Sequence, residues 1–205
     1  LPNLSAADET EQNDLNKDSG SAWQYSHLVL GAVGIFVYVG AEVSIGSFLV
    51  SFFAEPNIAG LEESEAAKYI AYYWGGAMVG RFIGAVVMQK IAAGKVLCFN
   101  AALAVGLILV TILSSGTIAM VAILLVGLCN SIMFPTIFTL SIQDIDELKP
   151  QASGILCTMI VGGAIIPPLY GFITDLAGFK TAMILLLACY GYIYYFAKST
   201  SKNLV

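Results

Sequence analysis

The side chains of this sequence that could carry chemistry are few, and they lie inside long apolar stretches. Glu42 stands in the middle of GIFVYVGAEVSIGSF, and Arg81, the only arginine, stands in the middle of GGAMVGRFIGA. An ionisable side chain at the centre of a membrane-spanning helix costs about 3 kcal/mol or more on insertion, so it must be paired, protonated or exposed to water. We therefore expect Glu42 and Arg81 to belong to a functional site or to an internal ion pair.

Two interpretations of Glu42 are open on the sequence alone. If the first two spans end near residues 53 and 69, Glu42 and Arg81 both lie about three helical turns, or about 17 Å, below the same membrane boundary. They can therefore form a static ion pair that joins two helices. Alternatively, Glu42 faces a cavity, where it accepts hydrogen bonds from the hydroxyl groups of a substrate or carries a proton.

Asn130 and Tyr38 are the polar side chains that best complement Glu42. Asn130 lies in GLCNSIMFPT, and its amide suits a hydroxylated ligand or a neighbouring helix. Tyr38 lies one helical turn before Glu42 on the same face, and its ring and hydroxyl suit the mixed faces of a sugar. Glu42, Asn130 and Tyr38 are therefore the candidate substrate-binding residues. We assign no catalytic residue, metal site or cofactor, because the sequence has no HExxH motif, phosphate-binding loop or Ser/His/Asp set.

Glycines form small-residue faces on two of the apolar stretches. They are Gly76, Gly80 and Gly84 in one stretch and Gly162 and Gly163 in another. Such faces allow helices to pack closely in a membrane, and they could also form the moving seam of a transporter. Pro135 and the pair Pro167-Pro168 remove backbone hydrogen bonds in the fourth and fifth stretches, which points to a site or a hinge.

The composition indicates which kind of structural element positions these residues. The chain has 205 residues, of which 58% are hydrophobic and 11% charged, and its mean hydropathy is +0.83. A soluble domain typically carries about 25% charged residues, so this composition excludes a soluble enzyme, a nucleic-acid-binding protein and a disordered protein. Long unbroken apolar runs predict transmembrane helices rather than the alternating strands of a β-barrel. Membrane lipid is therefore an expected partner, and nucleic acid is not.

Six apolar stretches predict an all-α membrane protein with six transmembrane helices. They cover residues 26–53, 69–89, 96–114, 117–141, 153–174 and 179–197. We expect residues 1–24 to form an acidic cytoplasmic linker, residues 25–198 the six-helix bundle, and residues 199–205 a cytoplasmic tail. Six of the eight lysines fall on the side of the two termini, which predicts that both ends are cytoplasmic.

An internal repeat relates the first three stretches to the last three. A shift of 87 residues without gaps places Val39-Gly40 on Val126-Gly127 and Gly75-Gly76 on Gly162-Gly163. Because three spans separate each matched pair, the second copy must cross the membrane in the opposite direction. This is a 3+3 inverted repeat, which transporters use to build a central site. Chance recurrence of small residues in glycine-rich helices is the alternative.

Four stretches carry a resemblance to a known family. GIFVYVGAEVSIGSF, YWGGAMVGRFIGA, GLCNSIMFPTIF and IVGGAIIPPLYG resemble the second half of bacterial sugar transporters in the fucose/galactose/glucose:proton symporter family of the major facilitator superfamily. The resemblance covers about residues 25–197 and is closest to the glucose/galactose branch. It implies a twelve-helix transporter of two halves, of which this chain corresponds to helices seven to twelve. The N-terminal six-helix half would be its partner.

The resemblance also implies roles for the candidate residues. The first and fourth spans, which carry Glu42 and Asn130, would line the central cavity, and the second and fifth spans would form the seam between the halves. The principal proton-coupling carboxylates of the family are expected in the first half, so Glu42 would be a substrate-binding or structural group. The loop MQKIAAGK departs from the superfamily signature, because Gln89-Lys90 replaces its acid and base, and gating by this loop is in doubt.

These features predict a secondary active transporter of the bacterial inner membrane. It would take up a hexose sugar together with a proton by alternating access, and it would not be an enzyme. A major facilitator transporter of another sugar or of an organic anion is the first alternative; Arg81 facing the cavity free of Glu42 would favour the anion. A six-helix membrane protein without transport activity is the second, although such a protein has no need of an inverted repeat.

Overall fold

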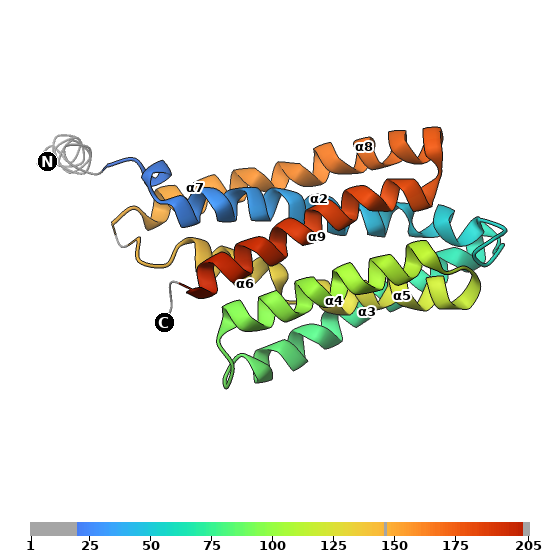
Figure 1. Cartoon of the computed structure of the whole chain (residues 1–205), viewed down its shortest axis with the longest axis horizontal. Coiled ribbons are helices and arrows are strands. Elements are labelled where there is room, and N and C mark those ends of the chain that lie inside the picture. The colour runs from blue at the N-terminus through green and yellow to red at the C-terminus, as the bar shows by residue number, and fades with distance from the viewer. Residues whose placement is uncertain (1–19, 146, 203–205) are drawn as a thin grey trace, which may run out of the picture.

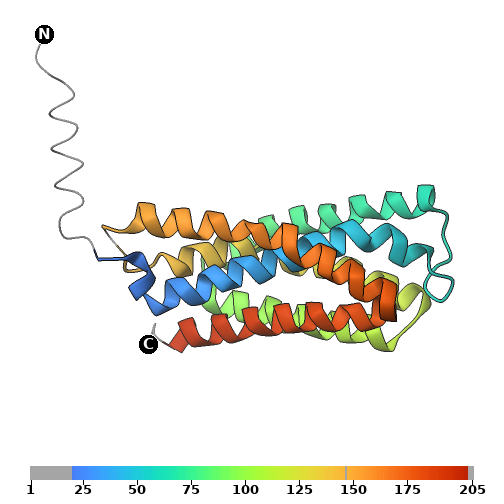
Figure 2. The same ribbon diagram turned by 90° about the horizontal axis from the view of Figure 1, so that it is seen from above.

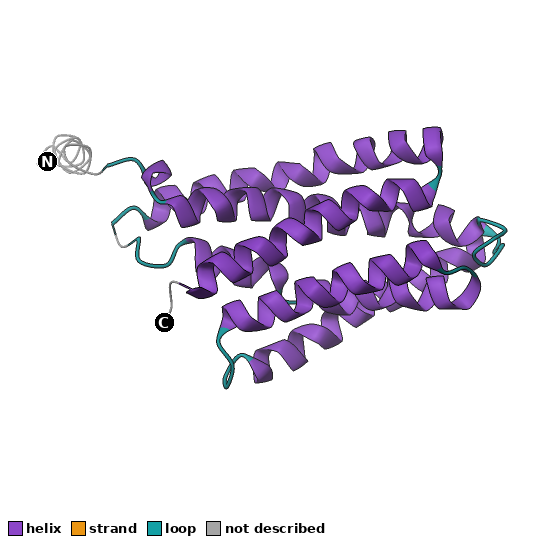
Figure 3. Cartoon of the chain, viewed as in Figure 1, coloured by secondary structure: helices purple, strands orange, loops and turns teal. Residues whose placement is uncertain are grey.

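The computed structural model describes residues 20–145 and 147–202, and every regular element in this part of the chain is a helix (Figure 3). A 3-10 helix, η1 (Ala22–Gln24), precedes six spans (Figure 1). The spans are α2 (Ser26–Ala54), α3 (Glu63–Val87), α4 (Ala93–Leu113), α5 with α6 (Gly116–Asn130 and Met133–Ser141), α7 with η2 and α8 (Lys149–Thr158, Met159–Val161 and Gly162–Ala177), and α9 (Phe179–Lys202). Each is long and apolar enough to cross a membrane. The predicted all-α fold with six transmembrane helices is confirmed.

Some helix ends differ from the prediction. Helix α3 begins at Glu63 rather than near residue 69, because Glu63 and Glu65 in its first turn interact favourably with the partial positive charge of the helix N-terminus. Helix α9 continues to Lys202, past the predicted boundary at residue 198. Most of the predicted acidic linker, residues 1–19, lies outside the described residues.

The fourth and fifth spans are interrupted, and in the fourth span the interruption agrees with the position of its proline. Helix α5 ends at Asn130 and α6 begins at Met133, so a short turn divides the fourth span. Pro135 has no N–H to donate to the carbonyl of Ser131, which prevents a continuous helix across this turn. In the fifth span, the 3-10 helix η2 joins α7 to α8, and Pro167 and Pro168 lie inside α8.

The first and fourth spans form the interior of the bundle. Helix α2 packs against α3, α6, α8 and α9, and α5 packs against α3 and α4. Of the most apolar window in each span, 61% is buried in the first and in the fourth, against 22% in the second and 28% in the fifth. Figure 1 shows α4 and α9 side by side at one face. The second and fifth spans are therefore the least buried of the six.

The helix bounds follow the 87-residue repeat. Adding 87 to the bounds of α2 gives 113–141, and the fourth span is Gly116–Ser141. The same shift carries α3 to 150–174, within the fifth span Lys149–Ala177. Figure 2 shows the start of α2 and the end of α9 at the same end of the bundle, as six crossings require.

The packing follows the repeat as well. A Cβ added to Gly84 of α3 would collide with Ile132 in the fourth span. A Cβ added to Gly171 of α8, the repeat equivalent of Gly84, would approach Phe48 of the first span to 2.8 Å. The predicted small-residue faces thus lie inside the bundle: those of Gly76, Gly80 and Gly84 against the fourth span, and those of Gly162 and Gly163 against the first. Each of these faces packs the second or the fifth span closely against an interior span.

Candidate polar site at the broken fourth span

Asn130, the last residue of α5, lies at the centre of a buried hydrogen-bond cluster. Its Nδ2 atom donates to the hydroxyl of Tyr73 at 2.9 Å, and its Oδ1 atom accepts from the hydroxyl of Tyr190 at 2.8 Å. Its backbone carbonyl accepts from the hydroxyl of Tyr38 at 3.0 Å. These four side chains, which we call the Asn130 cluster, are at most 2% exposed. The cluster joins the first, second, fourth and sixth spans.

The broken helix explains why the carbonyl of Asn130 is available. The last four carbonyls of a helix have no helical donor, and Asn130 ends α5. The next carbonyl, that of Ser131, would bond the N–H of residue 135 in a continuous helix, but Pro135 has none. Arg81 of α3 supplies the missing donor, because its Nε lies 3.3 Å from the Ser131 carbonyl oxygen. Side chains from two other helices therefore satisfy the two carbonyls at the break.

Glu42 lies beside the Asn130 cluster and near Arg81. It is half-buried, lies one helical turn after Tyr38 on α2, and interacts electrostatically with Arg81. The Tyr38 hydroxyl donates its one proton to the Asn130 carbonyl. Arg81 is exposed on the bundle, and its guanidinium has four N–H donors besides the Nε–H.

The structure therefore brings the four predicted polar residues together, although they come from three spans. Glu42 and Arg81 are partly open to the surroundings of the bundle, whereas Tyr38 and Asn130 are buried. Carboxylate, guanidinium and phenol groups in this arrangement can donate and accept hydrogen bonds, which is what binding of a polyhydroxylated ligand requires. Among the described residues, no group of three or more His, Cys, Asp or Glu side chains could hold a metal ion.

Tyr73 and Tyr190 belong to the cluster but escaped the sequence analysis. Tyr73 sits in the run Tyr72-Tyr73-Trp74, which is typical of an aromatic belt at the membrane interface. Tyr73 is nevertheless fully buried, while Tyr72 is 67% exposed and Trp74 44%. A tyrosine deep in an apolar run needs a partner for its hydroxyl, and this is the signal that could have identified Tyr190.

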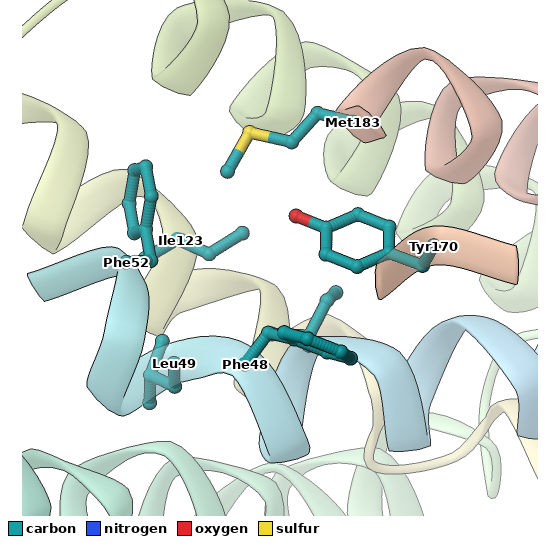
Figure 4. A pocket seen from close by; sticks show the side chains of 7 residues that line it. Phe48, Leu49, Phe52, Ile123, Tyr170 and Met183 are labelled. Carbon is teal, nitrogen blue, oxygen red and sulfur yellow. The ribbon is translucent and has the colours of Figure 1, made fainter. Parts of the chain in front are cut away.

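Two pockets lie outside the Asn130 cluster, and the larger one reaches Ser131 at the break of the fourth span. The smaller, about 200 Å³, is lined by Ile45, Phe48, Leu49, Phe52, Ile123, Tyr170 and Met183, and Figure 4 shows the hydroxyl of Tyr170 pointing into it. The ring of Tyr170 packs on Phe48 with the ring centroids 5.2 Å apart. The larger, about 540 Å³, lies between α3, α4 and the fourth span, and Asn100 and Ser131 are its polar side chains. Both linings are mostly apolar, so neither offers the hydrogen bonds that a sugar needs.

Known proteins with similar sequences are sugar transporters. No protein-family model matches the chain. The chain is 54% identical over 188 residues to a glucose/galactose transporter of Brucella abortus, a match that covers 92% of this chain and 46% of the relative. It is 48% identical over 188 residues to a putative glucose/galactose transporter of Helicobacter pylori, covering 89% and 46%. It is 32% identical over 169 residues to the L-fucose-proton symporter of Escherichia coli, covering 82% and 38%.

Solved structures that resemble this chain are also those of sugar transporters. The structure resembles the crystal structure of FucP, a major facilitator superfamily transporter, in the outward conformation, with a TM-score of 0.81 and 31% identity over 85% of this chain and 42% of that one. A variant of the Escherichia coli fucose:proton symporter FucP matches with a TM-score of 0.82 and 30% identity, over 86% and 43%.

The chain spans about half the length of the curated relatives it matches. The resemblance stated from the sequence is confirmed: the chain is a membrane protein homologous to bacterial glucose/galactose transporters, and its fold matches half of a major facilitator superfamily transporter. As predicted, its homologues are transporters and not enzymes.

Proposed function

We propose that this homologue of glucose/galactose transporters forms the C-terminal half, helices seven to twelve, of a proton-coupled hexose transporter that works by alternating access. The observation that carries the proposal is the group of Glu42, Tyr38, Arg81 and the Asn130 cluster beside the broken fourth span, in a chain with sugar transporters as relatives. The name of the L-fucose-proton symporter supports a proton as the coupling ion.

The partner would be the N-terminal six-helix half of the same transporter. The faces of the second and fifth spans that point away from the bundle support this arrangement, since Phe82 is 69% exposed and Phe172 is 62% exposed. Large apolar side chains on such a face require lipid or another helical bundle as a neighbour. In the proposed transporter, the two halves rock around a sugar bound at mid-depth, and the seam runs along these faces.

Glu42 is the residue proposed to contact the sugar most directly. A carboxylate accepts hydrogen bonds from adjacent sugar hydroxyls, and Glu42 is only half-buried, which leaves part of it accessible to a ligand. Arg81, which is exposed, would donate to the sugar as well. Tyr38 and Asn130 would hold the site in shape without direct contact with the sugar, because both are buried. The proposed location is the bacterial inner membrane, with both termini cytoplasmic because most lysines lie on that side.

A second candidate is a transporter of organic anions, and Arg81 is the observation that favours it. The Nε–H of Arg81 bonds a backbone carbonyl, so its other four donors suit a carboxylate. The test is uptake into proteoliposomes by the complete polypeptide, with labelled glucose, galactose, fucose and an organic acid, each with and without a pH gradient. Saturable hexose uptake that a proton gradient accelerates supports the proposed function; uptake of the acid alone favours the second candidate.

A further inference from the structure

Helices α3 and α4 follow one another in the chain but leave a gap between them. Each packs against α5, and neither packs closely against the other. The larger pocket, about 540 Å³, lies in this gap, with walls from α3 and α4 and a floor of Leu128, Ser131 and Ile132 from the fourth span. Ile83 on one wall and Phe99 on the other are both exposed, so the pocket opens on the outer surface of the bundle.

The lining of this pocket suits a hydrocarbon chain. Asn100 and Ser131 are its polar side chains, and the Asn100 amide already donates to the Val96 carbonyl at 3.1 Å. The walls run over residues 80–87 and 96–103, which is about 10 Å along each helix. One leaflet of a membrane has about 15 Å of hydrocarbon, so the pocket covers about two-thirds of it. An acyl chain in the gap supplies the packing contacts that the walls would otherwise lack.

Two exposed lysines mark one end of the pocket. Lys90 lies three residues past the α3 wall, and Lys95 lies directly before the α4 wall. Figure 1 shows this connection between α3 and α4 at the end of the bundle where α9 ends. The sequence has no acidic residue between Glu65 and Asp144 that could neutralise these lysines from the same segment. Lysines next to a membrane-spanning helix attract anionic lipid headgroups.

We propose that the gap between α3 and α4 binds an anionic phospholipid, with one acyl chain in the pocket and the phosphate group at Lys90 and Lys95. The apolar walls favour a lipid over a soluble anion, and the two lysines favour an anionic headgroup over a zwitterionic one. The proposed seam between the halves includes α3 but not α4, so a lipid reaches the gap from the side of α4. The bound chain holds α3 and α4 apart beside the break of the fourth span.

The headgroup contact is tested with two lipids that have the same acyl chains. Binding of dioleoyl phosphatidylglycerol and dioleoyl phosphatidylcholine to the complete transporter is measured in detergent by native mass spectrometry. A lysine beside an anionic lipid contributes about fivefold in affinity, so we expect the wild type to prefer phosphatidylglycerol by about tenfold or more. The double variant Lys90→Ala with Lys95→Ala should lose this preference. The matched control, Lys68→Ala with Lys180→Ala, removes the same charge at the opposite end of the bundle and should keep it.

The acyl-chain contact is tested with a large ring on either of two α4 positions. Leu103 lines the pocket and is 39% exposed, whereas Leu109 lies outside the lining and is 42% exposed. Leu103→Trp should weaken binding of both lipids about fivefold or more, and Leu109→Trp should leave it unchanged. Equal binding of the two lipids by the wild type, an equal loss in both lysine pairs, or unaltered binding by Leu103→Trp would overturn the proposal.

A measurement on the wild type keeps the proposal testable if a variant fails to fold. Phosphatidylglycerol with a photoactivatable group on its acyl chain should cross-link to residues 80–87 and 96–103, and cross-links confined to other residues would contradict the proposal. None of these measurements depends on transport. Absence of hexose uptake would therefore contradict only the proposed function.

Discussion

The hydroxyl of Tyr190 lies 2.8 Å from the side-chain oxygen of Asn130, so the last helix of the bundle bonds the residue at which the fourth span breaks. With Tyr73 on its nitrogen, the amide of Asn130 has a tyrosine partner at each end, and both partners are fully buried. The amide keeps a second N–H and a second lone pair, but Asn130 is only 1% exposed, so a sugar cannot reach it. In this conformation Asn130 is therefore not accessible to a ligand and stabilises the candidate site through its hydrogen bonds. Glu42 and Arg81 are the groups of the site that a ligand can reach.

Replacing Tyr190 with phenylalanine should destabilise the protein. The substitution leaves the Oδ1 atom of Asn130 buried without that donor, which costs about 1–3 kcal/mol. We expect the apparent free energy of unfolding in detergent to fall by about that amount. Tyr195→Phe is the control, because Tyr195 is 57% exposed and its loss should change stability by less than about 0.5 kcal/mol. Equal stability of the two variants would show that the hydrogen bond between Tyr190 and Asn130 contributes nothing to stability.

Alanine at two repeat-equivalent glycines should have effects of opposite sign. A Cβ at Gly162 would collide with the backbone carbonyl of Phe36, so Gly162→Ala should cost about 2 kcal/mol or more. Gly75, 87 residues earlier, has no neighbour within 4 Å of its added Cβ, and Gly75→Ala should stabilise by about 0.5–1 kcal/mol through helix propensity. Thermal unfolding of the two variants measures this difference. A stabilising Gly162→Ala would refute the close packing of α8 on α2.

Lys180 should stabilise the loop at the end of α4. Its Nζ atom donates to the carbonyl of Ser114 at 2.8 Å, just past the helix C-terminus, where a cation is favourable. Lys180→Met should lower stability by about 0.5–1 kcal/mol, with a smaller difference at high salt. Unfolding at low and at high ionic strength would measure this; a cost that is the same at both would assign the effect to lost packing.

The sequence predicts the polar site well for residues that stand out in an apolar run. Glu42, Arg81 and Asn130 are conspicuous because each is expensive in a membrane, and Pro135 indicates a broken helix. Tyr73 and Tyr190 are not conspicuous, because a tyrosine in a membrane helix is as typical of the interface as of a buried bond. Helical periodicity also gives no information on which spans meet, so the donor for the Ser131 carbonyl could be found only in the folded chain.

The most direct test of the account is uptake by the complete transporter carrying Glu42→Gln, because Glu42 is the group proposed to contact the sugar. Glucose and galactose uptake into proteoliposomes is measured across a range of external pH, beside the wild type and Glu63→Gln, a control in the first turn of α3. The account predicts at least about tenfold lower uptake for Glu42→Gln and wild-type uptake for Glu63→Gln. Normal uptake by Glu42→Gln with a normal pH dependence would contradict it.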